Sequence, residues 1–280
     1  MQITFICVRC ATVYSVVNWL ALVMKLENQE GIEKLYFELA SESRFSILRE
    51  LNRKNGKMKE IAGQLNLTIT ETFRQLQRLN EALFVQKQPD GGYTITEYGR
   101  FVLQLSTSFE FIYKYRQYFS THDFRRLPYQ FQNRIGELSL ASLGIDTMEN
   151  INLAERITRE AEQYMWGGGV EQSLNISSIL MESIPKGVKY KFLFPQRFIN
   201  PRPLPPKMAG AIEWRSFEDL PVNIVLTEKE AGISFCLVGG KADYVGFAGK
   251  DPVFLGWVKD LFCYYWEKGK RAYHGTGPQK

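Results

Sequence analysis

Histidine and cysteine are both scarce in this sequence of 280 residues. The chain has two histidines and four cysteines, which are His122, His274, Cys7, Cys10, Cys236 and Cys263. Neither histidine lies beside a cysteine or within a serine nucleophile motif, so catalysis by a histidine-dependent triad is not expected. The cysteines are too few for a secreted disulfide framework, and free thiols favour a reducing compartment. We therefore expect a cytoplasmic protein that is not an enzyme.

Metal-binding and phosphate-binding motifs are missing or incomplete. Cys7 and Cys10 form C-x-x-C, but no second pair of ligands follows at the spacing of a zinc site. Residues 166–169 read Trp-Gly-Gly-Gly, yet neither the Lys-Ser/Thr pair of a P-loop nor G-x-G-x-x-G follows, so we interpret them as a flexible strand-to-helix turn. Residues 201–206 fit P-x-x-P and are interpreted as an extended loop. We expect no metal and no cofactor.

An uncharged, largely apolar stretch runs from Cys10 to Met24. It is shorter than the roughly 20 residues that span a bilayer as a helix, and no small-x-small cleavage site follows it. A membrane anchor, a signal peptide and an upstream extension are the three interpretations. Because Met24-Lys25 looks like an ordinary cytosolic start, we favour an apolar extension over residues 1–24 that results from a mis-assigned start codon, and we expect no membrane partner.

Neither sign of charge dominates the chain, whose formal net charge is +5. Residues 25–136 carry 17 Lys and Arg against 13 Asp and Glu, whereas residues 137–280 carry 17 against 17. The basic excess belongs to the first half, where it would add salt-dependent affinity for a polyanion without selecting a sequence. A hydrophobic content of 45% with 14% aromatic residues is sufficient for a packed core in each of two domains.

Residues 68–83 have the pattern of a capped amphipathic helix. Thr68 to Glu71 fits S/T-x-x-E, in which the first hydroxyl and the Glu carboxylate each satisfy a backbone N–H at a helix start. Apolar residues recur at spacings of three and four, which predicts one buried stripe formed by Leu65, Ile69, Phe73, Leu76, Leu79 and Leu83. The opposite side of the helix is then left facing solvent.

That outward side carries hydroxyl, carboxylate, amide and guanidinium groups from Thr70, Glu71, Arg74, Gln75 and Arg78. Such a mixture can hydrogen-bond base edges and phosphates, which is typical of a helix that lies in the major groove of DNA. We predict base contacts by Thr70, Arg74 and Gln75, and phosphate contacts by Lys57, Lys59, Arg78 and Lys87. Thr68 and Glu71 at the helix start complete the predicted DNA-binding set. The alternative interpretation is that this side of the helix is only exposed to solvent and does not bind DNA.

The segments around this helix have the order of a winged helix-turn-helix. Residues 44–51 predict a first helix, and residues 57–65 predict a short second helix that stops at Asn66. Residues 83–87 and 93–95 predict two strands, and residues 89–92, Pro-Asp-Gly-Gly, supply the turn of a β-hairpin between them. The helix from Thr68 would be the recognition helix, and the hairpin would be the wing.

A further helix is predicted from Glu97, with Thr96 as its cap. Its apolar side continues through Phe101, Leu105, Phe109, Ile112 and Tyr113 toward Tyr118. In many winged-helix proteins the helix after the wing pairs with its twofold mate, so one interpretation is a homodimer that binds symmetric half-sites. The other interpretation is packing against the first helix.

From about Met148 onward, helical segments alternate with β-branched or aromatic runs, which predicts an α/β domain. The helical segment is Ala154–Gln163, and the runs are 188–194, 222–226, 233–238 and 244–247. Residues 252–268 predict a closing helix with Phe254, Trp257, Val258, Leu261 and Tyr265 on one side. The aromatic cluster of this helix, Trp257, Phe262, Tyr264, Tyr265 and Trp266, is interpreted as core packing rather than as the lining of an effector pocket.

Several segments resemble a known family. Residues 41–48, 61–67, 74–79 and 93–99 resemble archaeal winged-helix regulators of the ArsR-like group, and residues 161–166, 187–191 and 257–266 resemble the domain that accompanies them in methanogenesis-regulatory transcription factors. This second half is also similar to the sensor domains of archaeal sugar-responsive regulators, which have a phospholipase-D-like fold without its activity. The signature H-x-K-x4-D is absent, because neither His122 nor His274 has Lys two residues later. The resemblance implies effector sensing without hydrolysis.

We therefore predict an α+β winged helix-turn-helix followed by an α/β sensor domain that is phospholipase-D-like without catalytic residues. The expected domains are the N-terminal extension at 1–24, the DNA-binding domain at 25–100, connecting and dimerisation helices at 101–147 and an effector-sensing domain at 148–275. The expected function is a dimeric transcription regulator whose partners are double-stranded DNA and a small-molecule effector. A phosphodiesterase-like enzyme and a winged-helix protein-interaction module are the alternatives.

Overall fold

The computed structural model describes residues 31–170, 187–198 and 211–272. Contacts divide the chain into two units, a first unit (Met1–Gln104) and a second unit (Leu105–Lys280). The expected domain boundaries at 100/101 and 147/148 differ from this division. The predictions for the N-terminal extension, the P-x-x-P segment and His274 lie outside the described residues. Within the described ranges, no helix is both long and apolar enough to cross a membrane.

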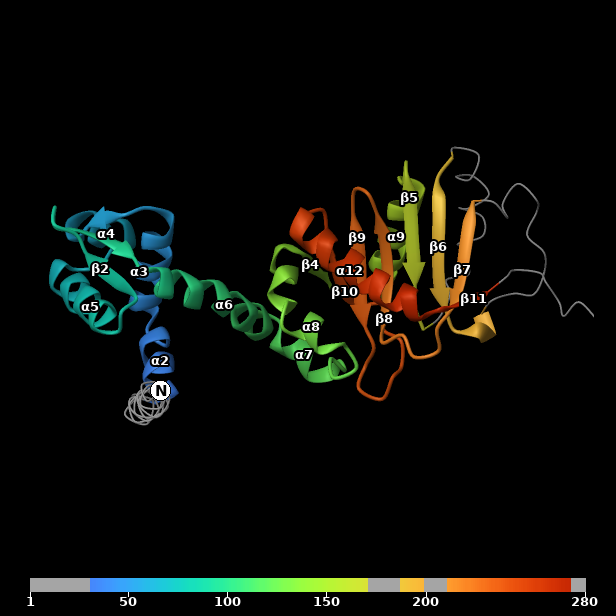
Figure 1. Ribbon diagram of the computed structural model, residues 1–280, viewed down its shortest axis with the longest axis horizontal. Coiled ribbons are helices and arrows are strands. Elements are labelled where there is room, and N and C mark those ends of the chain that lie inside the picture. Colours follow the sequence, from blue (N-terminus) through green and yellow to red (C-terminus); the bar gives the residue numbers. More distant parts are fainter. Residues whose placement is uncertain (1–30, 171–186, 199–210, 273–280) are drawn as a thin grey trace, which may run out of the picture. The chain divides into compact units, whose positions relative to one another are not determined.

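The first unit combines helices with a small antiparallel sheet in strand order β1-β3-β2 (Figure 1). Its core contains Ile47, Leu48, Leu76, Leu79 and Phe84. The order of elements agrees with that expected of a winged helix-turn-helix, and an additional helix precedes them. The elements are α2 (Ile32–Leu39), α3 (Glu42–Arg53), β1 (Gly56–Lys57), α4 (Met58–Leu65), α5 (Ile69–Glu81), β2 (Val85–Lys87) and β3 (Gly92–Ile95).

Three local signals of the sequence are confirmed. Asn66 ends α4 in the left-handed conformation, with φ of 53°. The Thr68 hydroxyl accepts a hydrogen bond from the backbone N–H of Glu71 at 3.1 Å, which caps α5. The Thr96 hydroxyl accepts from the N–H of Gly99 at 2.9 Å at the start of α6 (Glu97–Lys114). Side-chain chemistry at these positions therefore sets where the helices begin and end.

The buried stripe predicted for α5 is wrong at three positions. Leu76 and Leu79 are buried, but Ile69 and Phe73 are 45% and 50% exposed, and Leu83 is also exposed. Each residue of a helix advances about 100° around the axis. Ile69 and Phe73 therefore lie beside the strip of helix surface that contains the buried Thr72 and Leu76, and not within it. Leu83 follows the end of the helix, and helical periodicity no longer applies to it.

The second unit contains an eight-stranded mixed sheet in the order β11-β7-β6-β5-β8-β9-β10-β4. The pairs β5–β6 and β6–β7 are parallel, and the remaining pairs are antiparallel. The strands are β4 (Ser142–Gly144), β5 (Tyr164–Gly168), β6 (Lys189–Phe194), β7 (Ile212–Ser216), β8 (Val222–Thr227), β9 (Ala231–Phe235), β10 (Gly246–Gly249) and β11 (Lys270–Ala272).

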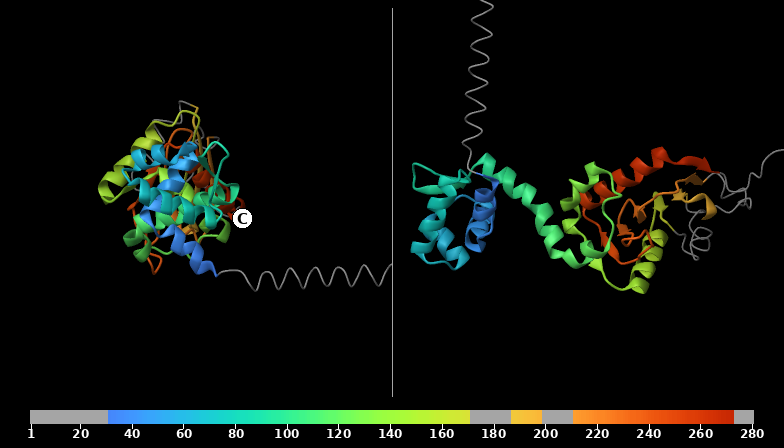
Figure 2. Two further views of the ribbon diagram at one scale, coloured as in Figure 1. Left: turned by 90° about the vertical axis from the view of Figure 1, so that its left-hand side faces the viewer. Right: turned by 90° about the horizontal axis from the view of Figure 1, so that it is seen from below.

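Helices cover both faces of this sheet, with α12 (Pro252–Lys268) on one side and α9 (Thr147–Arg159) on the other (Figure 2). The closing helix is confirmed, and Trp257 and Leu261 on it are fully buried. Its aromatic cluster belongs mainly to the core, since Phe262, Tyr265 and Trp266 are also buried. Shorter helices complete the unit: α7 (Arg116–Thr121), α8 (Tyr129–Gln132) and the 3-10 helices η1 (Ile135–Leu140) and η3 (Gln196–Phe198).

Three predictions for the second half need correction. Residues 166–169 do not form a turn, because Trp166, Gly167 and Gly168 belong to β5 and pair with β6 and β8. The helix expected at 154–163 lies at 147–159, where the Asp146 carboxylate caps it by accepting from the N–H of Glu149 at 2.8 Å. Residues 101–147 are not only connecting helices, because Phe111 to Leu138 contribute to the core with α12.

Leu83 provides a test of local backbone strain. Its φ of 62° lies in the left-handed region, which disfavours any residue that has a Cβ, and its side chain makes little packing. We expect Leu83→Gly to raise the free energy of unfolding in urea by about 0.5–1 kcal/mol. Leu83→Ala keeps the Cβ and should change it by less than about 0.5 kcal/mol. If both substitutions changed the free energy of unfolding by the same amount, the backbone at Leu83 would not be strained.

Candidate nucleic-acid interface

A groove beside α5 brings together most of the residues predicted to contact DNA. It is lined by Arg44 of α3 and by Thr68, Glu71, Arg74, Gln75 and Arg78. Burial of Leu76 and Leu79 on the other side of α5 turns the polar side chains of α5 toward this groove. Thr70 is also exposed on α5. A single helix therefore presents one continuous polar surface, as the spacing of its apolar residues required.

The predicted residues on α5 differ in how strongly the protein holds them. Arg74 is exposed and makes no ion pair or hydrogen bond with the described part of the chain. The side-chain oxygen of Gln75 accepts a hydrogen bond from Nη1 of Arg44 at 3.1 Å, which leaves the amide nitrogen of Gln75 to donate. Arg78 is tied to Glu38 of α2, with Nη2 2.5 Å from Oε1. Arg74 is thus the guanidinium that is least restrained.

Glu38 and Arg44 form a buried anchor beneath this surface. The guanidinium of Arg44, whose residue is only 6% exposed, lies 2.8 Å from Oε2 of Glu38. It also donates to the backbone carbonyls of Phe37 at 2.7 Å and Glu38 at 2.9 Å, at the end of α2. Because Arg44 also binds Gln75, one side chain connects α2, α3 and α5.

The electrostatics of the two arginines differ. Burial lowers the pKa of Arg44, and the carboxylate of Glu38 opposes that effect. The hydrogen bond to Glu38 raises the pKa of Arg78, which is half-exposed. Since the ordinary pKa of arginine lies far above neutrality, both side chains remain cationic. Glu38 is therefore a single carboxylate shared by two cations.

Glu71 departs from its predicted role at the helix start. Thr68 supplies its half of the capping box, but the Glu71 carboxylate accepts a hydrogen bond from the Ser43 hydroxyl at 2.9 Å instead of turning back to the cap. The capping-box prediction is wrong in this half. The reason is tertiary, because α3 offers a hydroxyl donor to the first turn of α5. Glu71 thereby links α3 to α5.

The predicted phosphate ligands outside α5 gather at one end of the small sheet. Lys57 of β1 is in register with Gly92, and Lys87 of β2 is in register with Tyr93, so the two lysines flank the same end of β3. This is the end at the hairpin turn, where Gly91 has a φ of 81°. Lys59, on the first turn of α4, is exposed, as are Lys57 and Lys87.

Sequence reasoning missed Glu38 and Arg44, and it misplaced Phe73. Arg44 could have been found, because it shares a helical spacing of three and four with Ile47, Leu48 and Leu51 and therefore lies on the buried side of α3. The signal was overlooked because an arginine is rarely buried. Glu38 lies in a helix that was not predicted, and no pattern in the sequence links it to an arginine 40 residues later.

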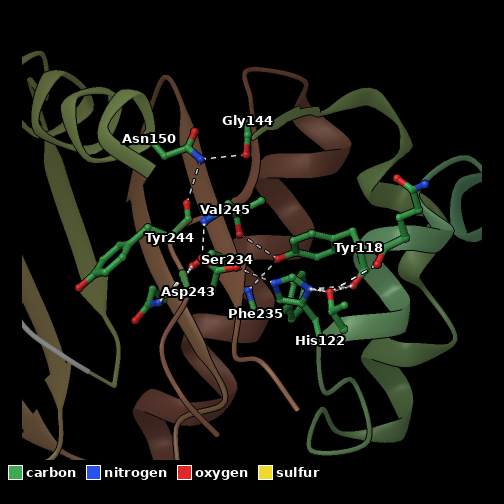
Figure 3. A network of polar contacts seen from close by, with 12 residues as sticks. Tyr118, His122, Gly144, Asn150, Ser234, Phe235, Asp243, Tyr244 and Val245 are labelled. Atoms are coloured by element: carbon green, nitrogen blue, oxygen red, sulfur yellow. Dashed lines mark hydrogen bonds and ion pairs between the residues drawn. The ribbon is translucent and has the colours of Figure 1, made fainter. Parts of the chain in front are cut away.

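The second unit holds a polar network around His122, the histidine within the described residues (Figure 3). Its Nε2 lies 3.0 Å from Oδ2 of Asp243, and its Nδ1 lies 2.7 Å from the backbone oxygen of Tyr118. Both ring nitrogens therefore face oxygen atoms, and the ring stacks on Tyr118 with centroids 3.6 Å apart. This geometry holds the loop that carries Asp243 in place.

The loop that His122 holds is residues 243–245. The Ser234 hydroxyl donates to the carbonyl of Asp243 at 2.5 Å, and the Tyr118 hydroxyl donates to the carbonyl of Val245 at 3.0 Å. Nδ2 of Asn150 donates to the carbonyl of Tyr244 at 2.9 Å (Figure 3). Burial raises the pKa of the Tyr118 hydroxyl, so it stays a donor. Side chains from α7, α9 and β9 thus fix three successive carbonyl groups.

Comparisons with known proteins give weak similarities. No family model matches the chain, and no curated protein matches it in sequence. Among solved structures, TrmBL2, described as an archaeal chromatin protein with a novel mode of DNA binding, has a TM-score of 0.38 at 15% identity, covering 86% of this chain and 97% of its own. NucT from Helicobacter pylori has a TM-score of 0.37 at 9% identity, covering 47% and 98%. CalO1, a methyltransferase in calicheamicin biosynthesis, has 0.23 at 15%, covering 73% and 66%.

The shared carboxylate of Glu38 predicts a large loss of stability on neutralisation. Glu38→Gln leaves the buried Arg44 without its ionic partner, and we expect the free energy of unfolding of the first unit to fall by about 3 kcal/mol. Glu33→Gln on the same helix removes an exposed carboxylate and should change it by less than about 0.5 kcal/mol. Urea denaturation monitored by circular dichroism measures both. Comparable small losses in the two variants would contradict the buried anchor.

Proposed function

We propose that this protein is a transcription regulator that binds double-stranded DNA through a winged helix-turn-helix at residues 25–100. The observation that carries the proposal is the exposed face of α5, where Thr70 and Arg74 lie next to Gln75 and Arg78 on a helix anchored by a short turn to α4. An α-helix fits the major groove of B-DNA, and these groups match the donors and acceptors of base edges.

The contacts divide between base reading and phosphate binding. Arg74 has the freedom to donate two hydrogen bonds to a guanine, and the amide nitrogen of Gln75 and the Thr70 hydroxyl supply further base contacts. Arg78 is held by Glu38, and a fixed guanidinium suits a phosphate at a constant position in the backbone. Lys57, Lys59 and Lys87 supply the remaining phosphate contacts, and the β2–β3 hairpin acts as the wing. Thr68 and Glu71 at the helix start complete the DNA-facing surface, where the Glu71 carboxylate can only accept hydrogen bonds, for example from a cytosine amino group.

The protein acts as a homodimer through α6. Phe101, Leu105, Phe109 and Tyr113 recur every four residues along this helix, and each is more than half exposed. Apolar side chains in such a row cost free energy in water, and a second copy of the same helix related by a twofold axis covers them with the same kind of surface. Two recognition helices then address symmetric half-sites on the DNA.

The second unit senses a small-molecule effector. Its α/β architecture agrees with a phospholipase-D-like domain at residues 148–275, following helices at 101–147, and the sequence lacks the His-Lys pair that hydrolysis by that fold requires. Both nitrogens of His122 contact oxygen atoms of the protein. An effector that binds one dimer conformation more tightly shifts the spacing of the two DNA-binding domains. The protein works in the cytoplasm, without a cofactor.

Substitution of Arg74 tests base reading. Genomic fragments that the purified protein retains at low salt define an operator, and fluorescence anisotropy measures its affinity. Arg74→Ala should weaken operator binding by about 1–3 kcal/mol, or roughly 5- to 150-fold, and relax the preference for operator over unrelated DNA. Lys59→Ala should weaken both DNAs alike and reduce the slope of log K against log salt by about one.

The control for this test is Arg159→Ala, which removes an exposed arginine from α9 in the second unit. It should leave the affinity for the operator and the salt slope unchanged. If Arg74→Ala and Lys59→Ala also leave both unchanged, α5 and α4 do not touch DNA. A wild-type protein that retains no DNA fragment at any salt concentration would instead favour a protein partner for this surface.

Dimerisation is tested on α6 with a matched pair of charges. Phe109→Glu places a carboxylate in the apolar row, whereas Thr107→Glu places the same charge on an exposed position about 200° away around the helix. Sedimentation equilibrium should show a dimer for wild type and Thr107→Glu, and a dissociation constant raised at least tenfold for Phe109→Glu. A monomeric wild type, or a dimer that tolerates both substitutions equally, would disprove pairing through α6.

A further inference from the structure

A row of small residues crosses the sheet of the second unit on the face that α9 covers. The strand registers align Gly167 of β5 with Val225 of β8, Val225 with Gly232 of β9, and Gly232 with Ala248 of β10. Residues in register project to the same face of a sheet, so four neighbouring strands present two hydrogens, one methyl and one isopropyl group there. A sheet covered by a helix ordinarily fills such a row with larger side chains.

The row leaves a space between the sheet and α9 that is partly open to solvent. A cavity of about 140 Å³ is bounded below by these four residues and above by α9 side chains that include Ile151, Ala154 and Ile157. No strain requires glycine at two of the positions, since neither Gly167 nor Gly232 has a positive φ. At Gly232 the absent side chain leaves space, since an added Cβ would meet only Cγ1 of Val225, at 3.1 Å. At Gly167 neighbouring side chains use the room, because an added Cβ would lie 3.2 Å from the methyl carbon of Met165 and 3.3 Å from the ring of Phe192.

The lining determines the chemistry of an occupant. Of the described residues that line the cavity, none is Lys, Arg or His, and the one charged residue is Glu155. Its polar groups already have partners: Asn223 Nδ2 donates to the Ser234 hydroxyl at 3.1 Å, and the Thr158 hydroxyl donates to the carbonyl of Ala154 at 2.8 Å. An anion would find no counter-charge, and a strongly polar molecule would lose water without regaining its hydrogen bonds.

We propose that this cavity is the effector site and that it takes a small, uncharged and mainly apolar molecule of about the size of a substituted benzene ring. The size follows from the volume, because an apolar protein cavity of about 150 Å³ accommodates benzene. This inference deepens the sensing role assigned to the second unit and rests on it. The site lies on the opposite face of the sheet from the aromatic cluster of α12.

The wall of the cavity is the loop that His122 holds. Tyr244 lines the space, and its carbonyl accepts from Asn150, which also lines it from α9. The adjacent Asp243 contacts His122, the residue that ends α7, and α7 follows α6 in the chain after a single residue. An occupant that moves Tyr244 therefore acts on a loop that also contacts α7, the helix that follows the dimerisation helix.

The test compares three ligands of one size and different charge on the full-length protein. Toluene, benzoate and benzylamine are titrated, and the melting temperature and ligand-observed NMR spectra are recorded. Toluene should bind at millimolar concentration and raise the melting temperature, whereas benzoate and benzylamine should each bind at least tenfold more weakly. Failure of toluene to bind, or benzoate that binds as tightly as toluene, overturns the proposal.

Filling the cavity locates the site. Ala154→Leu extends a side chain into the space and should weaken toluene binding at least tenfold, whereas Asn152→Leu adds the same side chain at an exposed position of α9 and should not. Should Ala154→Leu fail to fold, Gly232→Ala adds one methyl group, whose carbon would lie 3.1 Å from the movable Cγ1 of Val225, and should weaken binding at least threefold. Binding that survives the filling substitutions lies elsewhere and overturns the assignment.

Two outcomes separate this inference from the proposed function. Toluene binding by Arg74→Ala should equal that of wild type, because the substitution lies in the first unit. If the protein binds toluene in the cavity but binds no DNA, the proposed regulator function is wrong and the cavity site stands. If the protein binds its operator but does not bind toluene, the regulator function stands and this effector site is wrong.

Discussion

Burial of Leu76 and Leu79 is the constraint on which the arrangement of the first unit depends. These two side chains, with Thr72, fix the rotation of α5 about its own axis. Because each residue advances about 100°, the same rotation directs Arg74 almost opposite to Leu76, and Thr70 beside it. The polar surface of α5 is therefore a consequence of its apolar packing, and a substitution that altered that packing would redirect every side chain in the groove.

A second constraint comes from the charges beneath that surface. A buried ion pair gains little net stability, because two charges lose their hydration, but removing one partner is costly. Arg44 meets this condition with a carboxylate, two backbone carbonyls and the Gln75 amide oxygen, so its donors are used at the junction of three helices. The effect of the cluster is on geometry: it holds Gln75 and Arg78 at fixed positions, while Arg74, which directly precedes Gln75, is not held by it.

The sequence predicted the elements that rest on local chemistry. Caps at Thr68 and Thr96, the left-handed Asn66 and the glycine turn of the hairpin each act within a few residues, and α12 has a long, regular apolar side.

The errors have tertiary causes. Phe73 fits a helical stripe but stays half-exposed among the described residues, and Glu71 accepts a hydrogen bond from Ser43 on another helix. Gly167 and Gly168 were interpreted as a turn because glycine is rare in strands, whereas their partners on β6 and β8 define them as a strand. The DNA-contact residues remain predictions from helix periodicity, whereas their anchoring to Glu38 and Arg44 required coordinates.

A wrong interpretation of the local structure at a glycine can conceal a feature of the tertiary structure. In a loop, glycine supplies backbone freedom, but in a covered strand it supplies empty space. Unfilled space of about 140 Å³ beside α9 costs stability, because the groups that line it lose van der Waals contacts. A leucine in place of Ala154 on α9 would remove much of that cost within an otherwise unchanged helix. The chain nevertheless has alanine above the space and glycine at two positions below it, and the loop at its edge is held by side chains from α7, α9 and β9. A space that weakens the fold, bordered by a loop with this many fixed contacts, is the arrangement expected where an occupant supplies the missing packing and the loop responds to it.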